Sequence, residues 1–292
     1  MCSTRLDRRA FLAALALAAL DPRATDAAAP YAGRLIDAHS HLPNLQVLPT
    51  LVAAMDRHGI GQVALLGVGG VQKDDLAWIE SAAKRHPDRV IPAAPVPDPM
   101  APEAAARLEA QLETGRFRAA GEVHVHQASR KIRRAMDAPP FLAVLEVCAK
   151  HGVPLIIHDE LDPEVTAQLE RALAHHRKAI VVLAHAGSGA PTALAGLLAR
   201  HENLLLDVSG MHFLRTPALA TEKGALGGPW RDLLTAHADR ILVGIDVWAA
   251  QLFKPETLDR LMTWTRRILG ELPPDVAERL AHANAVRLFR LK

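Results

Sequence analysis

Histidine and glutamate residues stand together at two places in the sequence, in combinations that suit a metal centre. His39 and His41 form one His-x-His pair, His124 and His126 form another, and Glu122 comes just before the second pair. Imidazole nitrogens and carboxylate oxygens are preferred ligands of Zn2+ and related divalent cations. Because the chain has 15 histidines among 292 residues, a His-x-His pair alone carries little information. The position of each histidine within the predicted elements decides which ones matter.

Eight apolar segments of strand length recur along the chain, and each is followed by an amphipathic segment of helical length. We expect strands at 34–39, 62–68, 89–96, 117–125, 153–158, 179–185, 203–209 and 240–246. We expect helices at 47–58, 72–86, 101–115, 138–151, 162–177, 190–201, 229–238, 255–270 and 274–287, the last closing the bottom of the fold. Several strands are continuously apolar, as parallel strands buried on both faces should be. The alternation predicts an α/β fold with helices outside a parallel sheet.

The length favours one closed barrel over an open sheet. Without its first 29 residues the chain has about 263, close to the ~250 typical of a (β/α)8 TIM barrel. A doubly wound open sheet is the alternative, and it usually carries a glycine-rich phosphate-binding turn after its first strand. Residues 37–41 of this sequence, Asp-Ala-His-Ser-His, do not match such a turn. We therefore predict a single TIM-barrel domain over residues 30–292.

The histidines divide into two sets by predicted position. Seven fall near helix C-termini, where a polar or cationic side chain suits the helix dipole and the free carbonyl groups: His58, His86, His151, His175, His176, His201 and His237. The chemistry-bearing residues at strand ends are His39, His41, Glu122, His124, His126, His158, His185 and Asp246. In a barrel these ends meet at one face, where active sites of this fold are built. Burying such groups unpaired costs several kcal/mol each, and a shared cation removes that cost.

Longer motifs make the sequence similar to a known family. They are Leu35–Leu42 (LIDAHSHL), the segment 136–158, VVLAHAG at 181–187, RILVGID at 240–246 and ANAVRLF at 283–289. Together they resemble the amidohydrolase superfamily, particularly its amidohydrolase-related (amidohydrolase 2) branch, over essentially all of residues 30–292. The resemblance implies a metal-dependent TIM-barrel hydrolase.

The same resemblance implies roles for individual residues. His39, His41 and His158 would be metal ligands, His185 a ligand or a catalytic group, and Asp246 a ligand that also shuttles the proton. A bound cation would activate water, Asp246 would take its proton, and His185, if not a ligand, would stabilise the oxyanion.

The number of metal ions stays open at this point. Many two-metal members of the superfamily carry a carboxylated lysine on strand 4, and residues 117–126 contain no lysine. Glu122 resembles instead the bridging glutamate of TatD-like hydrolases. Either two ions are bridged by Glu122, or one ion is held by His39, His41, His158 and Asp246. Zn2+ is the expected metal, with Mn2+, Fe2+ and Co2+ as alternatives.

Substrate contacts are expected around the same face. We name His124, His212, Arg215 and Trp248 as candidate substrate-binding residues, and His124 is also a candidate ligand. The long segment 210–228 is either a lid or a flexible surface insertion. The basic stretch 130–134 is expected to be a solvated face, with attraction of a carboxylate-bearing substrate as the alternative.

Three functions follow from this reading. The leading one is hydrolysis of a C–O or C–N bond in a small lactone, ester or amide by a metal-activated water. The second is metal-dependent non-oxidative decarboxylation, since relatives in this branch carry out that reaction. The third is an exported metal- or solute-binding protein without turnover.

The N-terminus resembles an export signal. Arg8-Arg9 precede the apolar residues 10–20, and small residues follow up to Ala29. This is the pattern of a signal peptide over residues 1–29, of the bacterial twin-arginine type, and predicts a periplasmic or secreted protein without a membrane anchor in its mature form. The formal net charge of +2 gives no reason to expect a nucleic-acid partner, so a small-molecule substrate is the expected partner.

Overall fold

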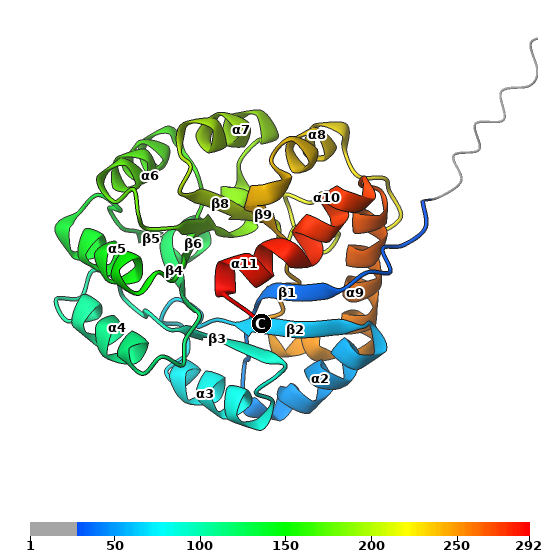
Figure 1. Cartoon of the computed structure of the whole chain (residues 1–292), viewed down its shortest axis with the longest axis horizontal. Coiled ribbons are helices and arrows are strands. Elements are labelled where there is room, and N and C mark those ends of the chain that lie inside the picture. The colour runs from blue at the N-terminus through cyan, green and yellow to red at the C-terminus, as the bar shows by residue number, and fades with distance from the viewer. Residues whose placement is uncertain (1–27) are drawn as a thin grey trace, which may run out of the picture.

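The computed structural model of the chain describes residues 28–292, and parallel strands ringed by helices form its frame (Figure 1). Eight strands neighbour one another in the order β1-β2-β3-β4-β6-β7-β8-β9. Their bounds are β1 (Leu35–Ser40), β2 (Ile60–Leu65), β3 (Val90–Ala94), β4 (Ala119–Gln127), β6 (Leu155–Asp159), β7 (Val181–Leu183), β8 (Leu204–Asp207) and β9 (Ile241–Leu242). The predicted (β/α)8 barrel is confirmed. The predicted signal peptide falls almost wholly on residues 1–27, outside the described part of the chain, and stays a prediction.

The helices alternate with the strands as the sequence pattern predicts. They are α2 (Leu48–Arg57), α3 (Asp75–Arg85), α4 (Ala104–Glu113), α5 (Pro139–His151), α6 (Pro163–His175), α7 (Pro191–Arg200), α8 (Gly228–Ala236), α9 (Pro255–Gly270), α10 (Pro274–Glu278) and α11 (Asn284–Phe289). Local signals fix their ends. Asp162 caps α6 by accepting a hydrogen bond from the Val165 amide at 2.8 Å. Gly152, at φ +60°, ends α5 in the left-handed conformation that glycine adopts without strain.

Main-chain hydrogen bonds join the last strand to the first, which nearly closes the barrel. The Ala38 amide donates to the Val243 carbonyl at 3.0 Å, and the Asp246 amide donates to the His39 carbonyl at 2.8 Å. Gly244 permits this approach, because a Cβ atom at this position would lie 2.9 Å from both the amide nitrogen and Cβ of His39. The segment that carries Asp246 is therefore pressed directly against β1.

The barrel interior is packed with aliphatic side chains at its lower end. Ile36, Ile91 and Ile156 are among the buried residues of this cluster, which also includes Leu288 and Phe289 of α11. The helices α10 and α11 lie across that end of the barrel (Figure 1), as the sequence predicts. Because one end is filled by this packing, the polar strand ends gather at the other, which is the active-site face of barrels.

Several strands are shorter than the sequence pattern suggests, and the difference at β7 and β9 concerns residues of the site. The sixth and eighth predicted strands run to residues 185 and 246, but β7 ends at Leu183 and β9 at Leu242. Beyond these ends the backbone is left-handed at His185 (φ +53°) and at Asp246 (φ +56°). Non-glycine residues adopt this conformation rarely and at a cost of about 1–3 kcal/mol, and such residues cluster at functional sites.

A short additional strand, β5 (Ile132–Arg133), pairs antiparallel with the end of β4. It is the part of the sheet that the sequence pattern did not predict. Among residues 28–292, no helix is both long and apolar enough to span a bilayer.

Candidate metal centre

The polar strand ends surround a cavity of about 390 Å³ at the upper face of the barrel. Of the residues that the sequence nominates, those lining the cavity are His41, Glu122, His124, His158, His185, His212, Arg215, Asp246 and Trp248. His39 is fully buried and lies against His41 and Glu122. The structure therefore brings all ten candidate ligand, catalytic or substrate-binding residues to one site.

His39 and His41 face each other through their Nε2 atoms. Nδ1 of His39 lies 2.9 Å from the Asp207 carboxylate, and Nδ1 of His41 lies 3.0 Å from the Leu66 carbonyl. Both oxygens can only accept, so each Nδ1 is the donor and each neutral ring keeps a lone pair on Nε2. The two Nε2 atoms are 3.1 Å apart. Two facing lone pairs at this distance need a cation or a proton between them.

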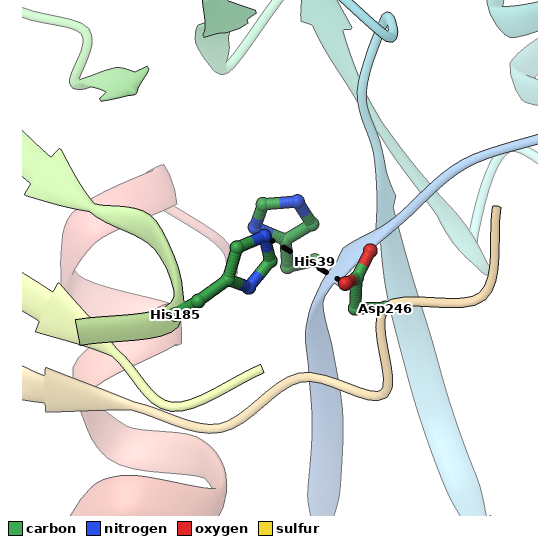
Figure 2. A group of neighbouring side chains, drawn as sticks. All are labelled: His39, His185 and Asp246. Atoms are coloured by element: carbon green, nitrogen blue, oxygen red, sulfur yellow. Dashed lines mark ion pairs between the residues drawn. The ribbon is translucent and has the colours of Figure 1, made fainter. Parts of the chain in front are cut away.

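His185 is held in the same way from another strand. Its Nδ1 lies 2.8 Å from the Ser209 carbonyl oxygen, which accepts its hydrogen. The Nε2 lone pair then faces two carboxylates, at 3.3 Å from Oε1 of Glu122 and 3.7 Å from Oδ2 of Asp246. Figure 2 shows His39 of β1 converging with His185 and Asp246, which lie on the segments that follow β7 and β9, and marks the His185–Asp246 pair by a dashed line. Nε2 of His185 and the two carboxylates can therefore act together as donors to a cation.

Glu122 lies at the centre of the cluster. Its Oε1 is 3.3 Å from Nδ1 of His158 and from Nε2 of His185, and its Oε2 is 3.3 Å from Nε2 of His124 and 3.5 Å from Nε2 of His41. Although burial opposes its charge, His39 and the surrounding imidazoles hold the pKa of Glu122 well below its usual range. The carboxylate is therefore ionised, with imidazoles on both of its oxygens.

Three groups of side chains in the described part of the chain are close enough to share an ion. They are His39, His185 and Asp246; His39, His41 and Glu122; and Glu122, His124 and His158. His158 joins only the group on the far side of Glu122, away from His39 and His41. The donor set is mixed imidazole and carboxylate, which fits Zn2+, Mn2+ or a similar divalent cation. Two groups that share one carboxylate fit a pair of ions.

Asp246 is buried and ionised. Although burial opposes its charge, His185, His41 and the Arg215 guanidinium hold the pKa of its carboxyl below the ordinary value. Oδ1 lies 3.5 Å from Nε2 of His41, and Oδ2 is hydrogen-bonded by the Arg215 guanidinium. Gly210 leaves the space for this contact, since a Cβ there would collide with both Arg215 and Asp246. Asp246 is thus held as an ionised carboxylate at the edge of the cluster.

The segment between β8 and α8 covers part of the site. Its residues 208–212 are buried, and His212, Leu214 and Arg215 all line the cavity. Main-chain hydrogen bonds hold it, including Leu219 amide to Met211 carbonyl at 2.9 Å. The segment is therefore an ordered wall of the site rather than a surface insertion.

The other basic residues and histidines named from the sequence lie either at the cavity or on the outer surface and at helix ends. Arg130 lines the cavity, whereas Arg133 pairs with Asp162 and Glu164 on the outer surface. The expected solvated face is thus correct for Arg133 and wrong for Arg130, which the β4–β5 hairpin turns inward. All seven histidines assigned to helix C-termini lie at or next to those ends: His58, His86, His151, His175, His176, His201 and His237.

Some residues of the site escaped the sequence analysis. Gln127, Ser129 and Gln251 line the cavity, and Ser209 orients His185. Polar residues of loops give no periodic signal, so only Ser209, two residues after Asp207 at the end of a strand, could have been found by the spacing that identified the histidines. Asp207, the last residue of β8, lies behind His39, with its carboxylate 2.9 Å from Nδ1 of that ring.

A profile of the family described as Amidohydrolase matches residues 36–291. Among curated proteins, no sequence matches significantly.

Solved structures share the fold at low sequence identity. An uncharacterised TIM-barrel protein from Bordetella bronchiseptica has a TM-score of 0.67 at 20% identity, covering 89% of this chain and 99% of that one. A probable 2-pyrone-4,6-dicarboxylic acid hydrolase from Acinetobacter baumannii, with citric acid bound, has a TM-score of 0.64 at 16% identity, covering 88% and 99%. A dihydroxybenzoic acid decarboxylase from Polaromonas, with manganese and 2-nitroresorcinol bound, has a TM-score of 0.60 at 17% identity, covering 89% and 97%.

Proposed function

The chain belongs to the amidohydrolase family, and on that basis we propose that it is a two-metal hydrolase cleaving a C–O or C–N bond of a small lactone, ester or amide. It is an enzyme of a metal-dependent class, with a cluster of metal-ligating side chains in the expected place. One observation carries the proposal: imidazole nitrogens from separate parts of the barrel gather around both oxygens of the ionised Glu122 carboxylate, a donor set that fits divalent cations.

The geometry supports one role for each ligand. We assign His39, His41 and Asp246 to a first ion, because Nε2 of His41 lies 3.1 Å from Nε2 of His39 and 3.5 Å from Oδ1 of Asp246. We assign His158 and His185 to a second ion, because each lies 3.3 Å from Oε1 of Glu122, which would stand between the two ions. His185 also lies close to His39 and Asp246. Zn2+ is the proposed metal, because it accepts mixed imidazole and carboxylate ligands in catalytic sites. His185 is assigned as a ligand rather than an oxyanion donor, because its Nδ1 hydrogen is already given to Ser209 and its Nε2 has none to give.

Divalent cations in such sites activate water and polarise a carbonyl oxygen. The protein itself moves the proton. Asp246 is ionised and only 2% exposed, and it lines the cavity. It can therefore accept the proton of the attacking water and return it to the leaving group. The Arg215 guanidinium on Oδ2 leaves Oδ1 as the oxygen that performs this transfer.

Decarboxylation of a small acid is the second candidate, because a decarboxylase shares the fold and Arg130 and Arg215 line the cavity. Guanidinium groups bind carboxylates well. Hydrolysis is favoured because Glu122 holds a bridging position between two imidazole sets, an arrangement suited to two ions that activate water together.

A substrate panel separates the candidates. Zinc-loaded protein would be offered lactones, aryl esters, amides and hydroxybenzoic acids, with proton release and CO2 release followed in parallel. Hydrolysis of an ester or lactone releases protons without CO2, as we expect. CO2 from an acid, with no hydrolytic turnover, would establish the decarboxylase instead. Fully metallated protein without turnover on any compound would favour the third candidate, an exported binding protein.

We also propose export to the periplasm, on the strength of the signal-like residues 1–29. Expression of the full chain in a bacterium, followed by fractionation and N-terminal mass determination, tests this proposal. A mature N-terminus near Ala29 in the periplasmic fraction is expected. Full-length protein confined to the cytosol would contradict it.

A further inference from the structure

His212 lies in the wall of the cavity outside the metal-ligand set. It is 4% exposed and lines the cavity between β8 and α8. Its place in the wall is fixed by the local chain, because the Arg215 amide donates to the His212 carbonyl at 3.0 Å. The imidazole is therefore held rigidly beside the cluster that binds the metal.

The local hydrogen bonds determine which ring nitrogen carries the hydrogen. The Leu214 amide donates to Nδ1 of His212 at 3.2 Å. Because an amide N–H can only donate, Nδ1 must be the acceptor, and the hydrogen of the neutral ring sits on Nε2. That Nε2 is buried and has no hydrogen-bond partner in the described part of the chain.

A buried donor without a partner costs free energy unless a ligand supplies the acceptor. The other imidazoles near the cavity centre cannot take over this function. The Nδ1 atoms of His41 and His185 donate to carbonyl oxygens, so their Nε2 atoms present lone pairs. His212 thus offers a neutral imidazole N–H in the wall of a cavity where Nε2 of His41 and of His185 present lone pairs. Burial and the nearby Arg215 also lower the pKa of His212 to about 4, which keeps the ring neutral near pH 7.

We propose that His212 is a catalytic residue whose Nε2–H donates a hydrogen bond to a substrate oxygen that becomes negative during the reaction. The proposal rests on the proposed function, because it assigns the oxyanion donor of that hydrolysis. Donors fixed in this way stabilise developing charge because they need no reorganisation during the reaction. The ligand class is a carbonyl compound that passes through a tetrahedral oxyanion.

Two substitutions separate this function from a role in holding the wall. His212→Asn keeps an oxygen near the Nδ1 position, where it can accept from Leu214, but it has no donor at the Nε2 position. His212→Gln reaches the Nε2 position with an amide N–H but moves the acceptor away from Leu214. His86→Asn, at the half-buried C-terminal end of α3, serves as the matched control.

Methylphosphonate is the probe, because its tetrahedral oxygens imitate the oxyanion. Its affinity for each zinc-loaded variant would be measured by calorimetry, with the zinc content checked by mass spectrometry. We expect at least tenfold weaker binding by His212→Asn and at most threefold weaker binding by His212→Gln, with His86→Asn unchanged. If His212→Asn binds as well as or better than His212→Gln, the ring only supports the wall and the proposal fails.

Nitrogen NMR of the zinc-loaded wild-type protein gives an independent readout. With 15N-labelled histidine, the His212 signals are identified by their loss in His212→Gln. We expect a protonated Nε2 and an unprotonated Nδ1, with the Nε2 signal shifting when methylphosphonate is added. A hydrogen on Nδ1, or an Nε2 signal that does not respond to bound phosphonate, would overturn the assignment. Neither measurement requires turnover, so failure of the proposed hydrolysis and failure of this inference remain distinguishable.

Discussion

Nε2 of His39 lies 3.1 Å from Nε2 of His41, although the Nδ1 atoms of both rings already donate to oxygen atoms of the barrel. Two neutral imidazoles in this arrangement direct lone pairs at each other. The buried Asp207 carboxylate holds the His39 ring, and the main-chain carbonyl of Leu66, the residue after β2, holds the His41 ring. Such preorganisation of ligands by supporting groups is usual in metal centres. A metal centre therefore accounts for these contacts better than the alternative that each polar residue is buried for its own structural reason.

Glu122 should determine how many ions the protein holds. The change Glu122→Gln replaces one carboxylate oxygen by an amide that donates rather than accepts, which removes the bridge between the two ligand groups. We expect the zinc content of reconstituted protein to fall from two ions per chain to one or none. Elemental analysis of the dialysed protein measures this. His126→Asn, on the same strand but outside the three ligand groups, should retain both ions. Equal metal content in Glu122→Gln and wild type would refute the bridge.

Asp246 should control turnover while leaving the fold intact. Asp246→Asn keeps the side-chain shape but removes the group that accepts the proton, so we expect a loss of about 10²–10⁴-fold in kcat. The measurement is steady-state kinetics on whichever panel compound is hydrolysed, with thermal unfolding as a check on folding. Asp232→Asn, at an exposed position of α8, is the control. Turnover within threefold of wild type would show that another group moves the proton.

The metal-free protein should lose stability as the pH falls because of His212. Its pKa is about 4 in the folded protein, below the ~6.5 of an unfolded histidine. Burial lowers this pKa most and Arg215 comes next, while Asp246 opposes the shift and His185 adds a smaller effect. The unfolded state therefore binds the proton more readily. The loss begins as the pH falls below about 6.5, is complete below about 4, and amounts to about 3 kcal/mol.

Urea unfolding at a series of pH values between 7 and 4 tests this dependence. His212→Gln carries no titrating ring, so its free energy of unfolding should fall less steeply over that interval than that of the wild type. Parallel pH profiles for the two proteins would show that His212 titrates normally in the folded state.

Cys148 should be inert in the native protein. It lies fully buried in α5, and burial raises the pKa of its thiol to about 12. Because the thiolate is the reactive form, a thiol reagent should not modify Cys148 at pH 8 until the chain unfolds. A Cys2→Ser variant leaves Cys148 as the one cysteine of the chain. Complete modification of that variant within minutes, without denaturant, would contradict the burial of this residue.

The sequence predicts the barrel and the site's ligands because both depend on local patterns. Continuous apolar runs mark buried parallel strands, and a histidine or acid at the end of such a run must lie at the shared face. His39, His158 and His185 follow this rule. The seven histidines at helix ends follow a second local rule, namely that helix C-termini favour polar or cationic side chains.

Other details of the site could not be predicted from the periodicity of the sequence, because they depend on tertiary contacts. The backbone is left-handed at His185 and at Asp246, beyond the early ends of β7 and β9, and the His185 ring is held by Ser209, which is distant in the sequence. The contact between Arg215 and Asp246 joins residues 31 positions apart through an irregular segment. The tautomer of His212 depends on one amide in that same segment. None of these features has a period that could be read from the sequence.

Anomalous diffraction at the zinc edge tests the metal centre most directly, using crystals grown with excess zinc. The account predicts two peaks beside the Glu122 carboxylate, one in contact with His39, His41 and Asp246 and the other with His158 and His185. A single peak would contradict the bridging role of Glu122. Crystals that show no anomalous density among these side chains would contradict the metal centre itself.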